Sequence, residues 1–302
     1  MKIIITGNTG FVGKNLMNFF NKKHVETQGL SLRDLSWKAD IDKKADCIIH
    51  LAAKAHDIDN KTLEEEYFDV NFGLTKEVFD VFIKSDIKDF FFFSSVKAVA
   101  DTVEGMLTEE NQFKTVLLTA FGRSKSNAET YILNQKLPEG KRLFIIRPCM
   151  IHGPGNKGNL NLLYKIVEKG IPWPLAAFEN QRSFLSIDNL SFLVLEMLSK
   201  PEIKSGIYNF ADDEPISTNQ LIKIIGSASG RKSKLWSISP YLIKGLAKIG
   251  NKMKLPLNSE RLKKLTESYV VSNQKIKTAL NINNLPLSAE EGLLKTIQSF
   301  KK

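Results

Sequence analysis

The first half of the chain alternates short, continuous apolar runs with longer stretches in which apolar residues recur every three or four positions. The short runs predict strands at Lys2–Thr6, Glu26–Leu32, Asp46–Leu51, Asp89–Ser94 and Arg142–Arg147. The periodic stretches predict helices at Val12–Asn21, Leu63–Lys84 and Arg123–Gln135. Four successive phenylalanines in Asp89–Ser94 suit a strand that is covered on both faces, as in a parallel sheet. We therefore expect an α/β fold built on a doubly wound parallel sheet.

The rhythm changes after Pro148, where a Gly-Pro-Gly loop follows. Short strands are predicted at Ser183–Ile187 and Gly206–Phe210, and helices at Asp188–Ser199, Thr218–Gly226 and Ala289–Phe300. The segment Asp188–Phe210 is typical of one more helix and strand of the large sheet, so the chain is expected to cross back to it. The sequence thus predicts a domain of residues 1–148 with part of 185–212, and a smaller α/β lobe from the remainder of 149–302.

A glycine-rich turn with the sequence TGNTGFVG, at Thr6–Gly13, joins the first strand to the first helix. Such glycines permit a tight turn and let the backbone approach a pyrophosphate closely. The start of the helix then offers free N–H groups and the positive end of its dipole. The position of the turn, after a strand and before a helix, is the context that dinucleotide binding requires. The residues expected to contact the phosphates are Gly7, Thr9, Gly10, Phe11, Val12 and Gly13.

The end of the second predicted strand bears on the choice of dinucleotide. Ser31 and Arg33 are suited to hold a 2′-phosphate, which favours NADP. Asp34 takes the acidic role that binds the ribose 2′-hydroxyl of NAD if the turn is longer than this alignment assumes. The expected cofactor is therefore NADP or NAD, with NADP slightly favoured.

With these motifs the sequence resembles the extended short-chain dehydrogenase/reductase family, which contains NAD(P)-dependent nucleotide-sugar epimerases, dehydratases and ketoreductases. Besides the turn, the resemblance rests on HLAA at 50–53, Val70-Asn71, Ser94-Ser95, Arg147-Pro148, HGPG at 152–155, Arg182–Phe184 and Asp188-Asn189. It implies a Rossmann fold with a dinucleotide-binding domain and a substrate lobe. It also implies cofactor contacts from Leu51, Ala52, Ala53, Ser94, Lys125 and Pro148.

The activity that this resemblance implies is oxidoreduction at carbon 4 of a nucleotide-diphosphate sugar. The stretches SSVK at 94–97 and GNKGNL at 155–160 are most similar to bacterial 4-epimerases and 4-ketoreductases of surface-polysaccharide synthesis. An epimerase retains its cofactor through oxidation and reduction of the sugar, whereas a ketoreductase releases it after each turnover. Both alternatives are open at this point.

One departure from the family concerns catalysis. The family uses a Tyr-x-x-x-Lys pair, and this chain has Phe121 and Lys125. Lys125 remains suited to hold the nicotinamide ribose, and Ser95 to hold the reacting sugar oxygen. Phe121 cannot carry a proton, and loss of a general acid–base group typically costs ~10²–10⁴-fold in rate. Three explanations are open: an engineered Tyr-to-Phe change, another proton carrier (Ser95, Lys97 or a water), or binding of cofactor and sugar without turnover.

The substrate-side residues are also expectations from the resemblance. Met150 and His152 would line the sugar pocket, and Asn159 and Leu160 would contact the nucleotide base. For His152 a satisfied loop histidine is an equal alternative. The substrate diphosphate would be held by an arginine, whose fork suits paired phosphate oxygens. The expected substrate-binding set is Lys97, Met150, His152, Asn159, Leu160, Arg182 and Arg261, with a surface role open for Arg261 and His56 as a further candidate.

Composition places the chain among ordinary globular proteins, with 42% apolar and 25% charged residues. No apolar run reaches the ~18 residues of a membrane span, and the N-terminus does not resemble a signal peptide. Two cysteines form no disulfide framework and favour a reducing, cytoplasmic location. The four histidines show no metal-ligand spacing, so no metal is expected. The resemblance further implies a homodimer formed by the helices around 63–84 and 120–137.

The net charge of +10 is concentrated in the C-terminal quarter, since residues 231–302 contain 15 Lys or Arg and 4 Asp or Glu. This excess can attract an anionic small molecule such as a nucleotide diphosphate. It can also serve a nucleic-acid or membrane surface, because Tyr241–Lys254 can form a basic amphipathic helix. A solvated lysine face is the third explanation. No aromatic residues interleave with the lysines as a stacking platform requires, so no nucleic-acid partner is expected.

Overall fold

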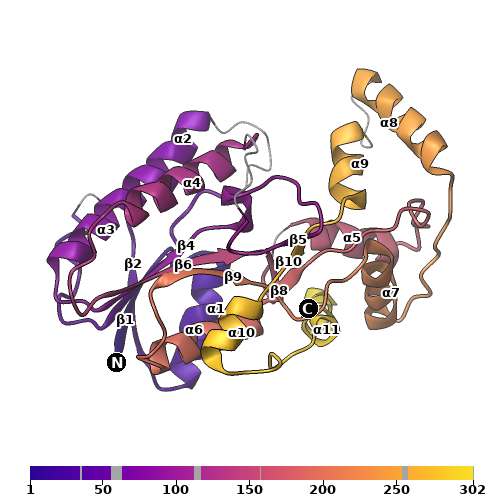
Figure 1. The fold of residues 1–302 in the computed structure, drawn as a ribbon. Helices are drawn as coiled ribbons and strands as arrows, with labels where there is room; N and C mark the ends of the chain where they lie inside the picture. Colours follow the sequence, from indigo (N-terminus) through magenta and orange to yellow (C-terminus); the bar gives the residue numbers. More distant parts are fainter. Residues whose placement is uncertain (35, 56–62, 112–116, 157, 254–257, 302) are drawn as a thin grey trace.

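The computed structural model describes residues 1–34, 36–55, 63–111, 117–156, 158–253 and 258–301. Its centre is a six-stranded parallel sheet with the strand order β2-β1-β3-β4-β6-β9 (Figure 1). The six strands are β1 (Lys2–Thr6), β2 (Glu26–Leu30), β3 (Cys47–His50), β4 (Asp89–Phe93), β6 (Arg142–Pro148) and β9 (Gly206–Phe210). The parallel α/β architecture predicted from the apolar runs is therefore confirmed.

The phenylalanine strand β4 shows why these runs are continuous. Every residue of β4 is buried, and alternate side chains enter opposite cores. The Phe91 ring lies 4.6 Å from that of Phe144 on one face, and the Phe90 ring lies 5.0 Å from that of Phe82 on the other. A strand in the middle of a parallel sheet has no solvent face, so both of its faces must be apolar.

Helices cover both faces of the sheet (Figure 1). One core joins α1 (Phe11–Lys22) and α6 (Ile187–Ser199) to the sheet. The opposite core joins α3 (Leu74–Lys84) and α4 (Ala120–Leu133) to it. The predicted return of the chain is confirmed, because α6 leads into β9 and β9 pairs with β6.

Two predicted helices differ from the structure in ways that affect the site. The single helix expected over Leu63–Lys84 consists of α2 (Glu64–Phe68), a π-helical turn η1 (Asp69–Gly73) and α3. The helix expected to begin at Arg123 begins at Ala120, because the Thr119 hydroxyl accepts a hydrogen bond from the N–H of Gly122 and caps it. This earlier start places Phe121 in the first turn of α4.

The remaining elements divide between the core that holds α1 and α6 and a third apolar core in the C-terminal half, which we call the second core. They include β7 (Met150–His152) paired with β8 (Phe184–Ser186), and β5 (Met106–Leu107) paired with β10 (Val270–Val271). The helices are α5 (Asn159–Glu168), α7 (Thr218–Ser229), α8 (Pro240–Met253), α9 (Ser259–Thr266), α10 (Gln274–Leu280) and α11 (Ala289–Gln298), with 3-10 turns η2 (Val96–Ala98) and η3 (Ser299–Lys301). Within the described residues, no helix has both the length and the apolar character needed to cross a membrane.

Candidate active site

The glycine turn lies at the carboxyl end of β1 and is closed by backbone packing. Gly7 has a φ of +68°, and a Cβ atom there would lie 2.7 Å from the backbone nitrogen of Ala52. A Cβ atom on Gly13 would lie 2.4 Å from the carbonyl oxygen of Gly7. Thr9 and Gly10 are exposed, and α1 begins after Gly10 with no side-chain cap. The first amides of α1 are thus presented beside an open backbone surface, as a phosphate site requires.

A series of buried hydrogen bonds holds the carboxyl end of the neighbouring strand β3. The Thr6 hydroxyl accepts hydrogen bonds from the N–H groups of Leu51 and Ala52, both at 3.2 Å. His50 bonds to Thr6 through Nδ1 at 2.8 Å and to the Thr75 hydroxyl through Nε2 at 2.9 Å. Burial lowers the pKa of His50 to about 3, so this imidazole is neutral. These hydrogen bonds therefore hold Leu51 and Ala52 against Gly7. The family resemblance places the cofactor beside residues 51–53.

The end of β2 lies beside the glycine turn, because Leu30 pairs with Thr6. The strand ends two residues earlier than predicted, and Ser31 and Arg33 are exposed just beyond it. The Asp34 carboxylate instead accepts hydrogen bonds from the N–H and hydroxyl of Ser36, which lower the pKa of Asp34. Ser31 and Arg33 are therefore accessible, while Asp34 is engaged in its own turn.

Asn8 is a residue of this region that the sequence analysis missed. A Cβ atom on Gly29 would lie 2.2 Å from Nδ2 of Asn8, so the Asn8 side chain lies directly on β2. A glycine inside a strand often marks such a close approach, and Gly29 was the signal that would have revealed it.

The two serines after β4 have different surroundings. Ser94 is buried and donates a hydrogen bond to Glu129. Glu129 in turn forms a buried ion pair with Arg147, with Nη2 and Oε2 2.5 Å apart. Ser95 is partly exposed, and its hydroxyl accepts the N–H of Lys97 at 3.1 Å. Ser94 is thus committed to the interior, whereas Ser95 is partly exposed at the same edge of the sheet.

Lys125 reaches the carboxyl end of β4 from the facing helix. Its Nζ donates to the carbonyl oxygen of Phe93 at 2.7 Å and lies 4.7 Å from the centre of the Phe92 ring. The side chain is almost completely buried, and this burial lowers the pKa of Lys125 to about 7, although Glu129 opposes the shift. Phe121 lies one helical turn earlier and is half-buried.

The start of α4 also touches the turn that carries Ser95. A Cβ atom on Gly122 would lie 2.6 Å from the carbonyl oxygen of Lys97. The Nζ of Lys97 donates to the carbonyl oxygen of Asp101 at 2.7 Å and lies 4.1 Å from the centre of the Tyr269 ring. Burial lowers the pKa of Lys97 to about 8. The structure thus brings the neighbourhoods of Ser95, Lys97 and Phe121 together at one edge of the sheet.

Three predicted substrate residues share a small cavity in the second lobe. Met150, Leu160 and Arg182 line a space of about 40 Å³ together with residues of α7 and α9. Arg182 donates a hydrogen bond to the carbonyl oxygen of Lys264, and burial lowers the pKa of its guanidinium. The cavity has room for one or two water molecules, so a sugar nucleotide would require the α9 side to move.

Other predicted residues lie elsewhere. His152 does not line this cavity, because its side chain is fully buried, with Nδ1 2.9 Å from the Thr296 hydroxyl and Nε2 3.6 Å from Asp212. His152 is the last residue of β7 rather than a loop residue, and its Nε2 has no hydrogen-bond partner among the described residues. Arg261 is exposed on α9 and does not line the cavity either. Asn159 is the first residue of α5, and His56 lies outside the described residues.

The residues after Arg147 close the edge of the sheet. Pro148 pairs with Phe210 at the end of β6, and the N–H of Cys149 donates to the carbonyl oxygen of Phe210 at 3.0 Å. Burial raises the pKa of the Cys149 thiol well above its usual range. This cysteine therefore acts as a small buried side chain rather than as a nucleophile.

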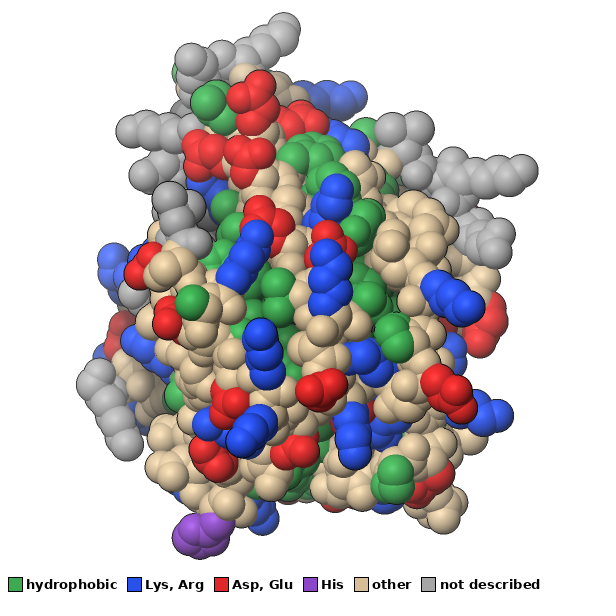
Figure 2. Space-filling view, turned by 90° about the vertical axis from the view of Figure 1, so that its left-hand side faces the viewer, with side chains coloured by type: hydrophobic (Ala, Val, Ile, Leu, Met, Phe, Trp, Pro, Cys, Tyr) green, Lys and Arg blue, Asp and Glu red, His purple; other side chains and the backbone are tan. Residues whose placement is uncertain are grey.

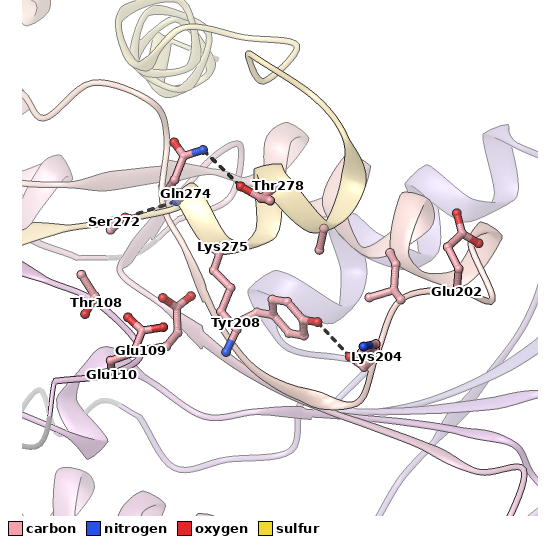
Figure 3. Close-up of a pocket in the computed structure, with 12 residues that line it drawn as sticks. Thr108, Glu109, Glu110, Glu202, Lys204, Tyr208, Ser272, Gln274, Lys275 and Thr278 are labelled. Carbon is pink, nitrogen blue, oxygen red and sulfur yellow. Dashed lines mark hydrogen bonds between the residues drawn. The ribbon is translucent and has the colours of Figure 1, made fainter.

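A larger cavity of about 590 Å³ lies apart from these residues, between β9 and α10 (Figure 3). None of the predicted site residues lines it. Glu109 accepts the N–H of Asn209 at 2.7 Å and thereby satisfies the open edge of β9. Lys275 extends towards Tyr208, with its Nζ 5.3 Å from the ring centre. These contacts stabilise the edge strand, and neither the glycine turn nor Lys125 lines the cavity.

Comparison with known proteins shows which family and which relatives this chain resembles. The model of the NAD dependent epimerase/dehydratase family matches residues 3–211. A UDP-glucose 4-epimerase of Vibrio cholerae is 29% identical, over 99% of this chain and 95% of its own length. An N-acetyl-α-D-glucosaminyl-diphospho-ditrans,octacis-undecaprenol 4-epimerase of Escherichia coli O157:H7 is 25% identical, over 98% of this chain and 94% of its own.

Solved structures share the fold at lower identity. A UDP-N-acetylglucosamine 4-epimerase from Bacillus cereus superposes with a TM-score of 0.75 at 18% identity, over 100% of this chain and 99% of its own. WbmG of Bordetella bronchiseptica, in complex with NAD, gives 0.76 at 16% identity, over 100% and 94%. RMD of Pseudomonas aeruginosa, complexed with NADPH, gives 0.74 at 18%, over 99% and 98%.

Proposed function

Because this chain belongs to the NAD dependent epimerase/dehydratase family, we propose that it is an NAD(P)-dependent 4-epimerase of a sugar diphosphate. The observation that carries the proposal is that the glycine turn after β1, Ser95 after β4 and Lys125, bonded to the carbonyl of Phe93, all lie at the carboxyl edge of the sheet. The 4-epimerase activity of the relatives supports epimerisation over net reduction. The proposed setting is cytoplasmic synthesis of surface polysaccharide.

The residues of this chain divide the work between the two lobes. Residues 1–148 with part of 185–212 form the dinucleotide-binding domain, and the remainder of 149–302 forms the substrate lobe. When bound, the nicotinamide supplies the reversible acceptance of a hydride from carbon 4 of the sugar. The amides after Gly10 bind the pyrophosphate, Lys125 orients the nicotinamide ribose, and the Ser95 hydroxyl holds the sugar O4. Arg182 pairs with the diphosphate of the substrate.

The proton that leaves O4 needs a carrier, because the Phe121 ring has none. Lys97 is the group that fits best. Lys97 follows Ser95 by two residues, and its backbone N–H donates a hydrogen bond to the Ser95 hydroxyl. The pKa of about 8 of its side-chain amine allows both protonation states near neutral pH. The O4–H bond breaks as a new N–H bond forms on Lys97. That N–H bond breaks again when Lys97 returns the proton to O4, as the hydride returns to carbon 4.

The preferred cofactor in this proposal is NADP. Ser31 and Arg33 are exposed beside the glycine turn, and the Asp34 carboxylate is bonded to Ser36. A 2′-phosphate would meet a hydroxyl and a guanidinium there. The fold alone accommodates either form, since similar structures contain NAD or NADPH.

Exchange of the proton carrier tests the catalytic assignment. Lys97→Met should lower kcat for 4-epimerisation of UDP-N-acetylglucosamine by about 10²–10³-fold, because it removes the acid–base group. Adding Phe121→Tyr to Lys97→Met should restore most of the loss, while Lys223→Met, on the exposed side of α7, should change little. Wild-type kcat/KM should rise with pH up to about pH 8, as Lys97 loses its proton.

Two outcomes would contradict this assignment. If Lys97→Met retains full activity, the proton takes another route. If the wild type binds NADP and UDP-sugar tightly but neither it nor Phe121→Tyr converts any substrate, the chain is a binding protein rather than an enzyme. That second candidate function is motivated by Phe121 alone.

A homodimer through α3 and α4 completes the proposal. The face formed by these helices shows hydrophobic side chains between acidic and basic ones (Figure 2). On it the rings of Phe72 and Tyr131 pack edge to face at 6.2 Å, and Leu133 is half-exposed. Two copies that cross here would bury these apolar side chains in a four-helix arrangement.

A further inference from the structure

Glu129 on α4 is a buried acid that lies one helical turn after Lys125. The Ser94 hydroxyl donates a hydrogen bond to its Oε1. Arg147 donates through Nε to both carboxylate oxygens, at 3.0 and 3.2 Å, and through Nη2 to Oε2. Ser94 follows β4 and Arg147 belongs to β6, so the carboxyl end of the sheet fixes the carboxylate in one place.

The ammonium of Lys125 is influenced by this carboxylate without pairing with it. Within the described part of the chain, Lys125 forms no ion pair, and its Nζ donates to the carbonyl oxygen of Phe93. An ammonium has three donors, so two of them remain for a ligand. Glu129 is the charged group that opposes the effect of burial on the pKa of Lys125. The charge of Lys125 is therefore supported while most of its donors stay open.

The other polar groups around Lys125 supply no negative charge. His50 on β3 is neutral, because burial and then Lys125 itself lower the pKa of His50 to about 3. Two cations, Arg147 and Lys97, belong to β6 and η2, and the acids of α2 are exposed. The side chains that η1 and α3 add to this interior are uncharged, namely Asn71 and Thr75. Glu129 is thus the buried counter-charge in this part of the described structure.

We propose that Glu129 is a positioning residue for Lys125, which keeps the ammonium charged and leaves two of its donors free for the ribose of the dinucleotide. This inference rests on the proposed function, which makes Lys125 the residue that orients the nicotinamide ribose. A direct ion pair would stabilise the charge as well, but it would occupy donors that the ribose hydroxyls need. Because Ser94 and Arg147 hold the carboxylate, its field acts through an interior of low dielectric constant instead.

A double-mutant cycle on the affinity for NADPH, measured by its fluorescence, separates this role from a structural one. Lys125→Met should raise the Kd about tenfold at pH 7, because it removes the ribose contacts. Glu129→Gln should raise the Kd about fivefold at pH 7 and hardly at all at pH 5.5. Without the carboxylate the pKa of Lys125 falls below about 7, and the affinity that its protonated form provides is lost as pH rises through that pKa. In the Lys125→Met background, Glu129→Gln should have no further effect.

Two further variants serve as controls. Glu64→Gln is the matched control, because it removes a carboxylate that is bonded to α4 through Arg123 but is exposed. It should leave the Kd unchanged at both pH values. Glu129→Gln leaves Arg147 buried without its partner, which can destabilise the fold. The pair Glu129→Gln with Arg147→Met removes both buried charges and should still weaken NADPH binding more at pH 7 than at pH 5.5.

The outcomes that contradict the inference are distinct from those that contradict the proposed function. Additive losses in the cycle would make Glu129 a structural residue, as would a loss from Glu129→Gln that is equal at both pH values. If Lys125→Met weakens binding and Glu129→Gln does not, the inference alone is overturned. If the wild type binds NADPH no better than Lys125→Met does, the proposed role of Lys125 is wrong, and this inference is wrong with it.

Discussion

At the scale of single residues, the interior position of Lys125 predicts how stability depends on pH. Its pKa falls from 10.5 in the unfolded chain to about 7 in the fold. Between these values the unfolded state binds the extra proton, so the free energy of unfolding rises with pH. Below pH 7 the folded protein bears the full cost of a buried charge. Lys125→Met should therefore stabilise the apoprotein by about 1–3 kcal/mol at pH 6, and the gain should fade towards pH 10.

Urea unfolding at pH 6, 8 and 10 measures this difference. Lys136→Met is the control, because Lys136 is exposed and its substitution should change the unfolding free energy by less than about 0.5 kcal/mol. A constant difference between wild type and Lys125→Met across the range would show that Lys125 is charged and well solvated in the fold.

The site residues that could be predicted from the sequence belong to short motifs of neighbouring residues. The glycines of the turn and the Phe121–Lys125 spacing are readable within eight residues or fewer. Glu129 was missed, although it lies one helical turn after Lys125, because its partners Ser94 and Arg147 come from other elements. The interior position of His152 was equally hidden, since its hydrogen-bond partner Thr296 is 144 residues away. Long-range partners leave no periodicity in the sequence.

At the scale of elements, the π-helical turn η1 contains the fully buried Asn71, whose side chain ties the turn to other elements. Its Oδ1 accepts the N–H of Lys54 at 2.8 Å, and its Nδ2 donates to the Lys54 carbonyl and to Ser124, both at 3.0 Å. Asn71→Ala removes these three hydrogen bonds and leaves the half-buried backbone groups of Lys54 without this partner, which should cost about 2–3 kcal/mol of unfolding free energy. Thermal and urea unfolding measure the loss.

The same substitution at an exposed asparagine gives the comparison. Asn127→Ala on α4 should change the unfolding free energy by less than about 0.5 kcal/mol. If Asn71→Ala proves equally mild, η1 is held by helix packing and not by the Asn71 side chain.

Strands whose residues are all buried were predicted correctly from their apolar runs. Elements that form only through contacts with residues far away in the sequence were not predicted. The strands of the sheet have apolar runs long enough to see, and β4 is the clearest case. The pair β5 and β10 has two residues in each strand and forms only because the chain returns to Met106 after more than 160 residues. The π-turn was missed because Tyr67, Val70 and Leu74 keep a helical spacing through it, while the hydrogen bonds of Asn71 reach Lys54 and Ser124 in distant segments.

At the scale of the whole molecule, the two lobes share one core. Leu185, Tyr269 and Val271 from the C-terminal half belong to the same buried cluster as Ile5 and Phe93. The Tyr269 hydroxyl also donates to the carbonyl oxygen of Ala100 at 2.8 Å, in the loop that follows Ser95 and Lys97. The lobes are therefore joined through the segment that holds the proposed proton carrier.

Such sharing predicts a single cooperative unfolding transition, although the length of 302 residues would allow two. Trp37 is buried in the N-terminal half and Trp173 in the second core, so variants that keep one of them report the two lobes separately. Their urea midpoints should coincide, and NADP at a hundred times its Kd should raise both by the same free energy, about 2.7 kcal/mol. A Trp173 midpoint that stays fixed while the Trp37 midpoint rises would mean that the lobes fold independently. In that case Tyr269 would not couple the substrate lobe to the cofactor site.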